Sequence, residues 1–354
     1  MVLLSVTHNN EPSPLKGRKP RFPMSRKLIV SFSLCASLLL LVSCGNGGKN
    51  IVGIAKFVAH PALDAVEQGI VDEIKASKPD MELDLQNSNA DMATAGQIAQ
   101  RFKENKVAVA VGIATPTAQA LANQIKDRPI VYSVVTDPVS AGLVESMDKG
   151  GDNITGTSDM TPVREQLDML LSIASAKAPL RRLGHLYSSG EANSAAIAAI
   201  VKAYCDEKGL EFVEVTVTNS AEVKSALLSI ADRIDGLYLG NDNTVFSALN
   251  AVSEVTLAKK IPLMSADPSS AETIPVLAAL GYDYYQMGRA TGKIVVRILN
   301  GEKTKDIPAY MPTGPEALVL VINQDVAKAL GLTLDPALVE RAKVLISGGT
   351  VTKK

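Results

Sequence analysis

Acidic side chains that could hold a cationic ligand group follow several predicted strands of this 354-residue chain. Asp137, Asp242 and Asp267 each come shortly after a short apolar run. In open α/β sheets, ligands bind outside the carboxyl ends of the strands, so binding residues are expected at such positions. Three carboxylates that converge on one cleft would pair with an ammonium group. A turn or helix-capping role is the alternative for each of them.

Other polar residues open predicted helices at the same edge. The segment Thr115-Pro116-Thr117 places a hydroxyl at an N-cap and a proline in the first turn, which is typical of a helix start. The free backbone N–H groups of such a helix bind a carboxylate without an arginine. Glu191 precedes a second helix start, where Asn193 and Ser194 could donate hydrogen bonds to an anionic or amide group. Capping alone is again the alternative.

These residues together predict a cage for a zwitterion, with helix N-termini for its carboxylate and acidic side chains for its ammonium group. The apolar part of a ligand could contact aromatic side chains, for which core packing is the alternative. The aromatic candidates are Phe57, Tyr132, Tyr187 and Tyr284. The predicted ligand-binding residues are Phe57, Thr115, Thr117, Asp137, Glu191, Asn193, Ser194, Asp242, Asn243 and Asp267.

Sequence signals for catalysis are weak. The chain has no Gly-x-Ser-x-Gly elbow, no His-Glu-x-x-His and no P-loop. The turn Gly112-Ile113-Ala114 lacks the full dinucleotide-binding glycine pattern. After the N-terminal region only His60 and His185 remain, far apart in sequence, so a metal site is not expected. We therefore expect a binding protein with no cofactor and no metal, not an enzyme.

The elements that must position these residues repeat one unit from Ile51 onward, a β-branched strand, a turn and an amphipathic helix. Strands alternating with helices require a parallel sheet with right-handed crossovers. Strands are predicted at 51–54, 82–85, 107–111 and 129–134, and, after a turn-rich segment at 149–153, at 182–187, 211–217, 235–239 and 262–265. Helices are predicted between them, the last over 243–259. The pattern predicts an α/β chain of two doubly wound parallel-sheet lobes that face each other across a cleft.

The first 43 residues predict export. Arg26-Lys27 precedes an apolar run from Leu28 to Val42 that ends in small residues, which is the order of a secretory signal peptide. Leu41-Val42-Ser43-Cys44 resembles the lipobox of bacterial lipoproteins, so Cys44 is the predicted lipidation site. A transmembrane anchor is the alternative, but the run falls short of the ~20 residues that a spanning helix needs. Met24 is an alternative start, because residues 1–23 are rich in Pro, Lys and Arg.

Cleavage before Cys44 would leave 311 residues, enough for two domains. It would remove six Lys or Arg and one Glu, and so change the formal net charge from −1 to −6. An acidic body argues against nucleic acid as a partner. Because Cys35 lies in the apolar run, Cys205 is the single cysteine of the predicted body, which excludes an intrachain disulfide there.

Several segments, taken as an ordered set, resemble one family. They are His60-Pro61-Ala62-Leu63-Asp64-Ala65, Ala114-Thr115-Pro116-Thr117-Ala118-Gln119, Val135-Thr136-Asp137-Pro138-Val139, Gly190-Glu191-Ala192-Asn193-Ser194, Asp242-Asn243-Thr244 and Gly281-Tyr282-Asp283-Tyr284-Tyr285. The chain resembles the substrate-binding lipoproteins of ABC importers that include tryptophan- and tyrosine-binding members, with the type I periplasmic-binding-protein fold.

The resemblance implies an exported protein, lipid-anchored to a bacterial membrane, that captures a small solute and delivers it to an ABC permease and its ATPase. It implies three crossings between the lobes, with lobe 1 at 51–156 plus 284–308 and lobe 2 at 157–283 plus 309–354, after a leader (1–43) and a lipidated linker (44–50). An amino acid, with an aromatic one as the leading expectation, is the implied ligand. A nucleoside, a sugar or another small polar solute is the alternative, as is a sensory ectodomain.

Overall fold

The computed structural model describes residues 50–175 and 178–354, and all structural statements below concern those residues. The predicted leader, Cys44 and the linker up to residue 49 lie outside the described residues. Within the described ranges, no helix is long and apolar enough to cross a membrane.

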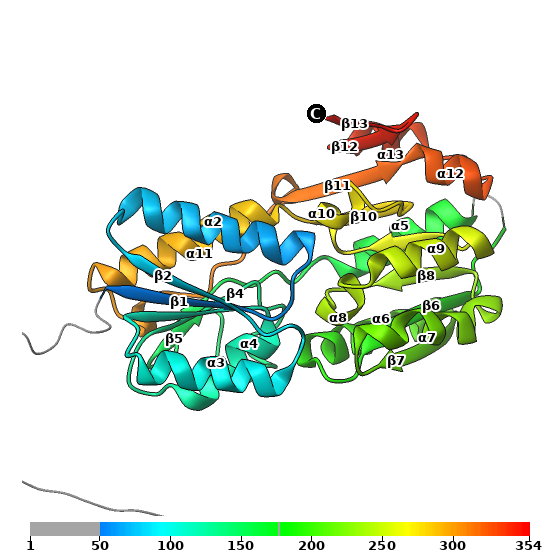
Figure 1. Ribbon diagram of the computed structural model, residues 1–354. Helices are drawn as coiled ribbons and strands as arrows, with labels where there is room; N and C mark the ends of the chain where they lie inside the picture. Colours follow the sequence, from blue (N-terminus) through cyan, green and yellow to red (C-terminus); the bar gives the residue numbers. More distant parts are fainter. Residues whose placement is uncertain (1–49, 176–177) are drawn as a thin grey trace, which may run out of the picture. The chain divides into compact units, whose positions relative to one another are not determined.

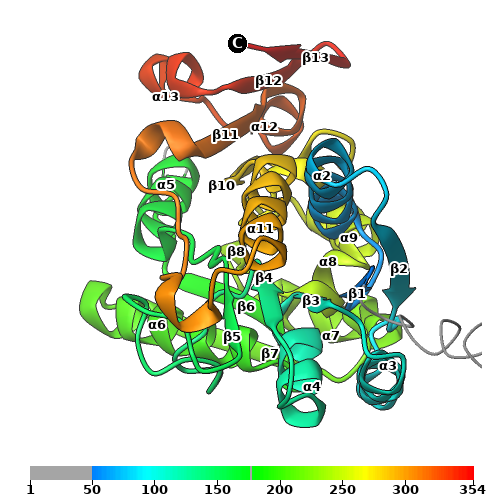
Figure 2. The same cartoon turned by 90° about the vertical axis from the view of Figure 1, so that its left-hand side faces the viewer.

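The first sheet is parallel, with the strand order β2-β1-β3-β4-β5. Its strands are β1 (Ile51–Lys56), β2 (Glu82–Asn87), β3 (Val109–Ile113), β4 (Ile130–Ser133) and β5 (Ile154–Gly156). Two helices pack side by side on one face, α2 (Pro61–Ser77) and α11 (Tyr284–Leu299), and two lie on the other, α3 (Met92–Glu104) and α4 (Thr115–Gln124) (Figures 1 and 2). We call this sheet and these helices lobe 1.

The close contact between α2 and α11 depends on glycine. A Cβ atom at Gly288 would lie 2.2 Å from the backbone oxygen of Val66, so no larger residue fits there without moving a helix. The Glu73 carboxylate accepts a hydrogen bond from Arg289 Nε at 2.7 Å beside this contact. The pairing brings a segment from late in the chain into lobe 1, and it places Tyr284 at the carboxyl end of the first sheet.

The second sheet is mixed, with the order β13-β12-β11-β10-β9-β8-β6-β7. Its strands are β6 (Arg182–Ser188), β7 (Glu211–Val217), β8 (Gly236–Leu239), β9 (Leu263–Ser265), β10 (Ala278–Tyr282), β11 (Leu318–Asn323), β12 (Val344–Ser347) and β13 (Thr350–Lys353). The predicted α/β fold class with two sheet-based lobes is confirmed, but the prediction of an all-parallel second sheet is wrong. β11 runs antiparallel to β10, to which the chain returns after passing through α11 of lobe 1, and β13 closes a hairpin on β12.

Helices connect most strands of the second sheet, as the predicted alternation of strands and helices requires. They are α5 (Val163–Ser175), α6 (Ala192–Lys208), α7 (Val223–Ile230), α8 (Asn243–Phe246), α9 (Leu249–Lys259), α10 (Pro268–Ala271), α12 (Gln324–Leu330) and α13 (Pro336–Arg341). Short 3₁₀ turns are η1 (Ser220–Glu222), η2 (Ala231–Arg233), η3 (Thr304–Asp306) and η4 (Pro315–Ala317). The single helix predicted over 243–259 is wrong, because the backbone leaves the helical region at Ala248 (φ −115°, ψ 20°) and separates α8 from α9. We call this sheet and its helices lobe 2.

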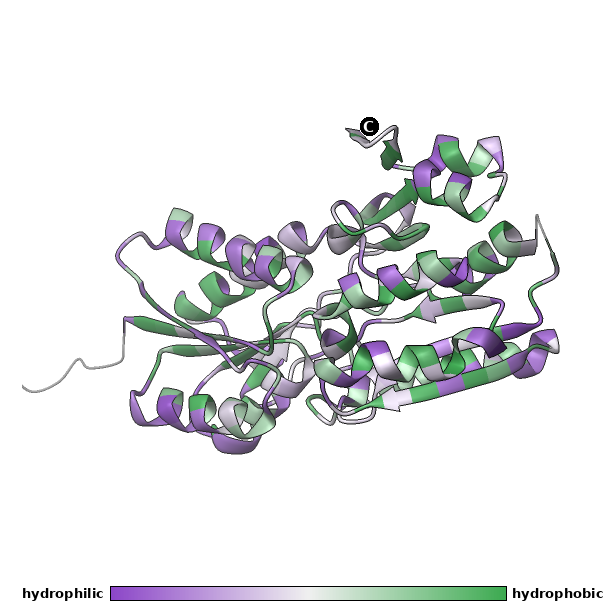
Figure 3. Cartoon of the chain, turned by 45° about the vertical axis from the view of Figure 1, so that its right-hand side comes forward, coloured by the Kyte–Doolittle hydropathy of each residue, from purple (hydrophilic) through white to green (hydrophobic). Residues whose placement is uncertain are grey.

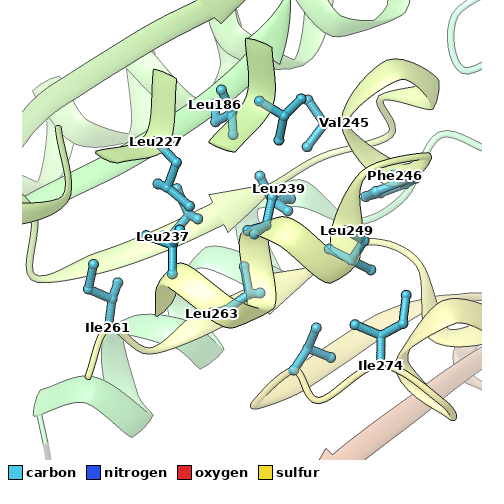
Figure 4. Packing of buried hydrophobic residues seen from close by; sticks show 14 of the residues in the cluster. Leu186, Leu227, Leu237, Leu239, Val245, Phe246, Leu249, Ile261, Leu263 and Ile274 are labelled. Carbon is cyan, nitrogen blue, oxygen red and sulfur yellow. The ribbon is translucent and has the colours of Figure 1, made fainter. Parts of the chain in front are cut away.

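Apolar packing fixes the elements that reach the strand ends. Figure 3 shows hydrophobic strands in both sheets and outer helices that alternate hydrophobic and polar residues. In lobe 2, the fully buried Leu237 and Leu239 of β8 pack in one cluster with Leu249 of α9 and Phe246 of α8 (Figure 4). Burial of one such side chain contributes about 1.5–3 kcal/mol. This cluster anchors α8, and with it the polar residues just before the helix.

Candidate functional site

A small cavity lies at the carboxyl ends of strands from both sheets. Lobe 1 lines it with His60, Ala62, Leu63, Thr115, Val134 and Thr136. Tyr284, at the start of α11, also belongs to lobe 1, and the remaining wall consists of Asp159, Asn193, Asn241, Asp242, Asn243 and Phe246. The cavity therefore lies where the strand-end rule predicts a ligand site.

The structure brings four of the predicted ligand-binding residues to this cavity. Thr115, Asn193, Asp242 and Asn243 line it, each from a segment that directly follows a strand or opens a helix. Tyr284, a candidate aromatic contact, also lines it. Glu191 and Ser194 lie just behind the lining and hold it in place.

The Glu191 carboxylate fixes the start of α8. One oxygen accepts hydrogen bonds from the Thr244 backbone N–H at 2.9 Å and the Thr244 hydroxyl at 2.7 Å. The other accepts bonds from the backbone and side chain of Asn243 and from Asn193 Nδ2. With this many donors on a buried side chain, Glu191 is part of the scaffold, and its oxygens are occupied by the protein itself.

Asp242 caps the same short helix from the other side. Its Oδ1 accepts a hydrogen bond from the Val245 N–H at 2.8 Å, and its Oδ2 accepts bonds from the Ser188 N–H at 2.6 Å and the Ser194 hydroxyl at 2.7 Å. Burial, reinforced by the negative charge of Glu191, raises the pKa of Asp242 to about 7. Asp242 thus lies in the cavity wall, while its carboxylate oxygens accept most of their hydrogen bonds from residues of lobe 2.

The other predicted residues lie outside the cavity lining. Asp137 closes its own turn, where Oδ1 accepts from the backbone N–H groups of Val139 at 3.1 Å and Ser140 at 3.0 Å. Asp267 caps α10 through Ser270. Phe57 packs in the core of lobe 1 and Thr117 is buried within α4. None of these four residues is part of the cavity lining.

Asp159 is a cavity residue that the sequence did not reveal. Its Oδ1 accepts a hydrogen bond from the Thr136 hydroxyl at 3.1 Å, and its Oδ2 accepts bonds from Asn241 Nδ2 at 2.9 Å and the Tyr284 hydroxyl at 3.2 Å. Burial raises its pKa to about 7, although these donors act in the opposite direction. Asp159 follows β5, a three-residue strand too short for a clear periodic signal.

Asp159 also lies where the chain passes from β5 to α5, so its partners come from both lobes. Thr136 belongs to lobe 1, Asn241 to lobe 2, and Tyr284 to the start of α11. One buried carboxylate therefore joins three segments that are remote in sequence.

His60 is a second missed residue. It precedes α2 in extended conformation, and its ring meets the ring of Phe246 edge to face with centroids 6.0 Å apart. The side chain is 6 % exposed, and neither ring nitrogen has a hydrogen-bond partner among the described residues. Burial lowers its pKa, against the pull of nearby carboxylates led by Asp267. The signal that could have marked it is the Pro61 that follows, which opens a helix as Pro116 does.

Backbone strain accompanies the lobe 1 wall. Ala114 has a φ of 76° and Val134 a φ of 48°, directly after β3 and β4. A β-branched residue in the left-handed region is a genuine outlier, and such strain clusters at binding sites. These two residues turn the chain at the edge of the cavity, so that Thr115 and Thr136 become lining residues.

The arrangement has opposite electrostatic ends. In lobe 1, helices α2 and α4 begin at the cavity with Leu63 and Thr115 in their first turns, and their first N–H groups have no intrahelical partners. On the other side, the buried amide oxygens of Asn193 and Asn241 lack partners among the described residues. Their Nδ2 atoms are engaged, Asn193 with the Asn241 carbonyl and Asn241 with Asp159, so the free oxygens are acceptors for a ligand.

Comparison with known proteins identifies the family. The model of the family described as ABC transporter substrate binding protein matches residues 51–346. The chain belongs to this family. A tyrosine-binding protein of Clostridioides difficile (strain R20291) is 35% identical over 288 residues, which cover 80% of this chain and 81% of the relative.

Two solved structures of substrate-binding proteins are also similar. An ABC domain in complex with L-Trp from Streptococcus pneumoniae has a TM-score of 0.79 and 30% identity, covering 84% of this chain and 100% of the other. A ligand-free, open substrate-binding protein with adhesive properties from Clostridium difficile has a TM-score of 0.60 and 35% identity, covering 81% and 96%. The TM-score is higher for the L-Trp complex than for the ligand-free, open structure, although the sequence identity is lower.

Proposed function

We propose that this substrate-binding protein captures an amino acid as a zwitterion, and that the amino acid is aromatic. The observation that carries the proposal is that one cavity holds a buried carboxylate, two unpaired amide oxygens and helix N-termini. Asp159 and the free amide oxygens of Asn193 and Asn241 suit an ammonium group, which needs several acceptors.

The ligand's carboxylate would lie at the helix N-termini. The lining includes neither lysine nor arginine among the described residues, so backbone N–H groups and helix dipoles supply the positive end. Thr115 at the first turn of α4 provides both a backbone N–H and a hydroxyl. This arrangement favours an amino acid over a sugar or nucleoside, because those ligands have no separated opposite charges.

Aromatic specificity is supported by the apolar part of the lining and by the named relatives. Phe246, Leu63 and Val134 supply apolar surface next to the polar groups. One relative is named a tyrosine-binding protein, and a solved neighbour holds L-Trp.

The proposal includes lipid anchoring at Cys44 and delivery of the ligand to an ABC permease and ATPase. The supporting observations are the signal-peptide pattern before Cys44 and membership of the family. A tether of a few residues would keep the binding protein at a high effective concentration near a membrane partner. Labelling of cells with radioactive palmitate, compared between the wild type and Cys44→Ser, tests the anchor.

The ligand is tested in two steps. Native mass spectrometry of the protein, expressed without its first 43 residues, should show a retained mass equal to one amino acid. The protein is then unfolded, dialysed and refolded, and calorimetry is run with each of the twenty amino acids, with myo-inositol and a nucleoside as controls. Binding of an aromatic amino acid in 1:1 ratio is expected. No heat with any amino acid would refute the proposal.

A further inference from the structure

His60 has hydrogen-bonding capacity that the protein itself leaves unused. Its ring lines the cavity and is 94 % buried, and neither Nδ1 nor Nε2 has a partner among the described residues. Most buried polar groups are paired, and an unpaired one is costly. Two unused nitrogens on one ring that faces a cavity therefore point to a ligand group that satisfies at least one of them.

The surroundings of His60 define what that group can be. Burial outweighs the pull of Asp267, of the nearby Asn243 side chain and of the Asp64 and Glu191 carboxylates, and lowers the pKa of His60, so the imidazole is neutral at neutral pH. A neutral imidazole has one acceptor nitrogen and one N–H donor. The acceptor nitrogen requires a donor on the ligand.

His60 and Asp159 serve different parts of the ligand. The groups bonded to Asp159 are Thr136, Tyr284 and Asn241, and none of these is a hydrogen-bond partner of His60 among the described residues. The ring that His60 contacts is the apolar Phe246, at an edge-to-face angle of 74°. An ammonium group belongs with the acceptors around Asp159, whereas an aromatic ring fits beside Phe246.

We infer that His60 is a specificity-determining residue that accepts a hydrogen bond from a donor on the ligand's aromatic ring. This inference rests on the proposed function. A phenol O–H or an indole N–H provides such a donor, and a plain phenyl ring does not. The site would thus select tyrosine or tryptophan and reject phenylalanine, because phenylalanine leaves the buried His60 nitrogen unpaired.

The test is the ratio of affinities for tyrosine, tryptophan and phenylalanine, measured by calorimetry on refolded protein. The wild type should bind tyrosine or tryptophan roughly 10- to 100-fold more tightly than phenylalanine, the factor expected for one buried unpaired group. In His60→Leu the preference should fall to within about threefold, because the affinity for the donor-bearing ligand drops and that for phenylalanine does not. The ratio is insensitive to the fraction of protein that is folded.

Two further variants make the outcome specific. His60→Gln keeps an acceptor and should retain part of the preference. His185→Leu is the matched control, since His185 is also buried with an unpartnered Nε2 among the described residues but lies in β6 away from the cavity lining. An unchanged preference in His60→Leu, or equal binding of phenylalanine by the wild type, would overturn the role of His60 while leaving the proposed function intact. Absence of aromatic amino-acid binding in every variant would overturn both.

Discussion

The two walls of the cavity differ in charge and in how they are built. Lobe 1 contributes no carboxylate to the lining and presents helix N-termini, with Leu63 and Thr115 in the first turns of α2 and α4. The opposite wall presents two carboxylates, Asp159 and Asp242, beside the amide oxygens of Asn193 and Asn241. Each wall thus suits one pole of a zwitterion. A ligand with both poles is stabilised by both walls, and so it favours the state in which they face each other closely.

The largest expected effect is that of Asp159→Asn on affinity. Loss of the buried countercharge should weaken amino-acid binding by roughly 2–5 kcal/mol, because the ligand's ammonium group would remain buried without its partner. Calorimetry on refolded protein measures this. Asp137→Asn is the matched control, since Asp137 closes a turn outside the cavity lining and its removal should leave affinity unchanged. A larger loss of affinity in Asp137→Asn than in Asp159→Asn would mean that Asp137, and not Asp159, pairs with the ligand's ammonium group.

The contrast between Asp137 and Asp159 also shows what sequence can reveal. The fold class could be predicted from strands that are clearly β-branched. Cavity residues such as Thr115 could be predicted from helices that start at proline. Asp137 and Asp242 both follow strong strands, and local sequence does not distinguish a turn residue from a cavity residue. Asp159 follows a three-residue strand, and its partners are remote in sequence, so only the folded chain brings it to the site.

A smaller effect, on stability, is expected for Glu191→Gln. The amide would place an NH₂ group against donors that now bond to Glu191, so the free energy of unfolding should fall by roughly 1–3 kcal/mol. Denaturation with urea, monitored by circular dichroism, measures the change. Glu145→Gln serves as the control, because the Glu145 side chain is 90% exposed. Unaltered stability in Glu191→Gln would mean that Glu191 is not part of the scaffold and belongs with the ligand-binding carboxylates.

In contrast to Glu191→Gln, Asp159→Asn should make the ligand-free protein more stable. Because burial raises the folded-state pKa to about 7, the folded protein binds this proton more tightly than the unfolded chain, and the contribution of Asp159 to stability declines as pH rises from about 4 to 7. The variant lacks this loss, and its NH₂ group can face the Thr136 hydroxyl, which can also accept a hydrogen bond, unlike the N–H donors around Glu191. It should therefore be more stable than the wild type by roughly 1–2 kcal/mol at pH 8, with little difference near pH 4. Scanning calorimetry at both values checks this, and a pH-independent difference would contradict it.

The smallest effect is expected on the lobe 1 wall, from Thr115→Val. If backbone N–H groups and the α4 dipole hold the ligand's carboxylate, loss of the hydroxyl removes one neutral hydrogen bond at most, and affinity should fall by only about 0.5–1.5 kcal/mol. Thr115→Ser keeps the hydroxyl and should match the wild type. A ligand that lacks the carboxylate, tyramine or tryptamine, should bind much more weakly to all three proteins. If Thr115→Val lost as much affinity as Asp159→Asn, side chains would bind both the carboxylate and the ammonium group of the ligand. The two walls would then differ only in charge.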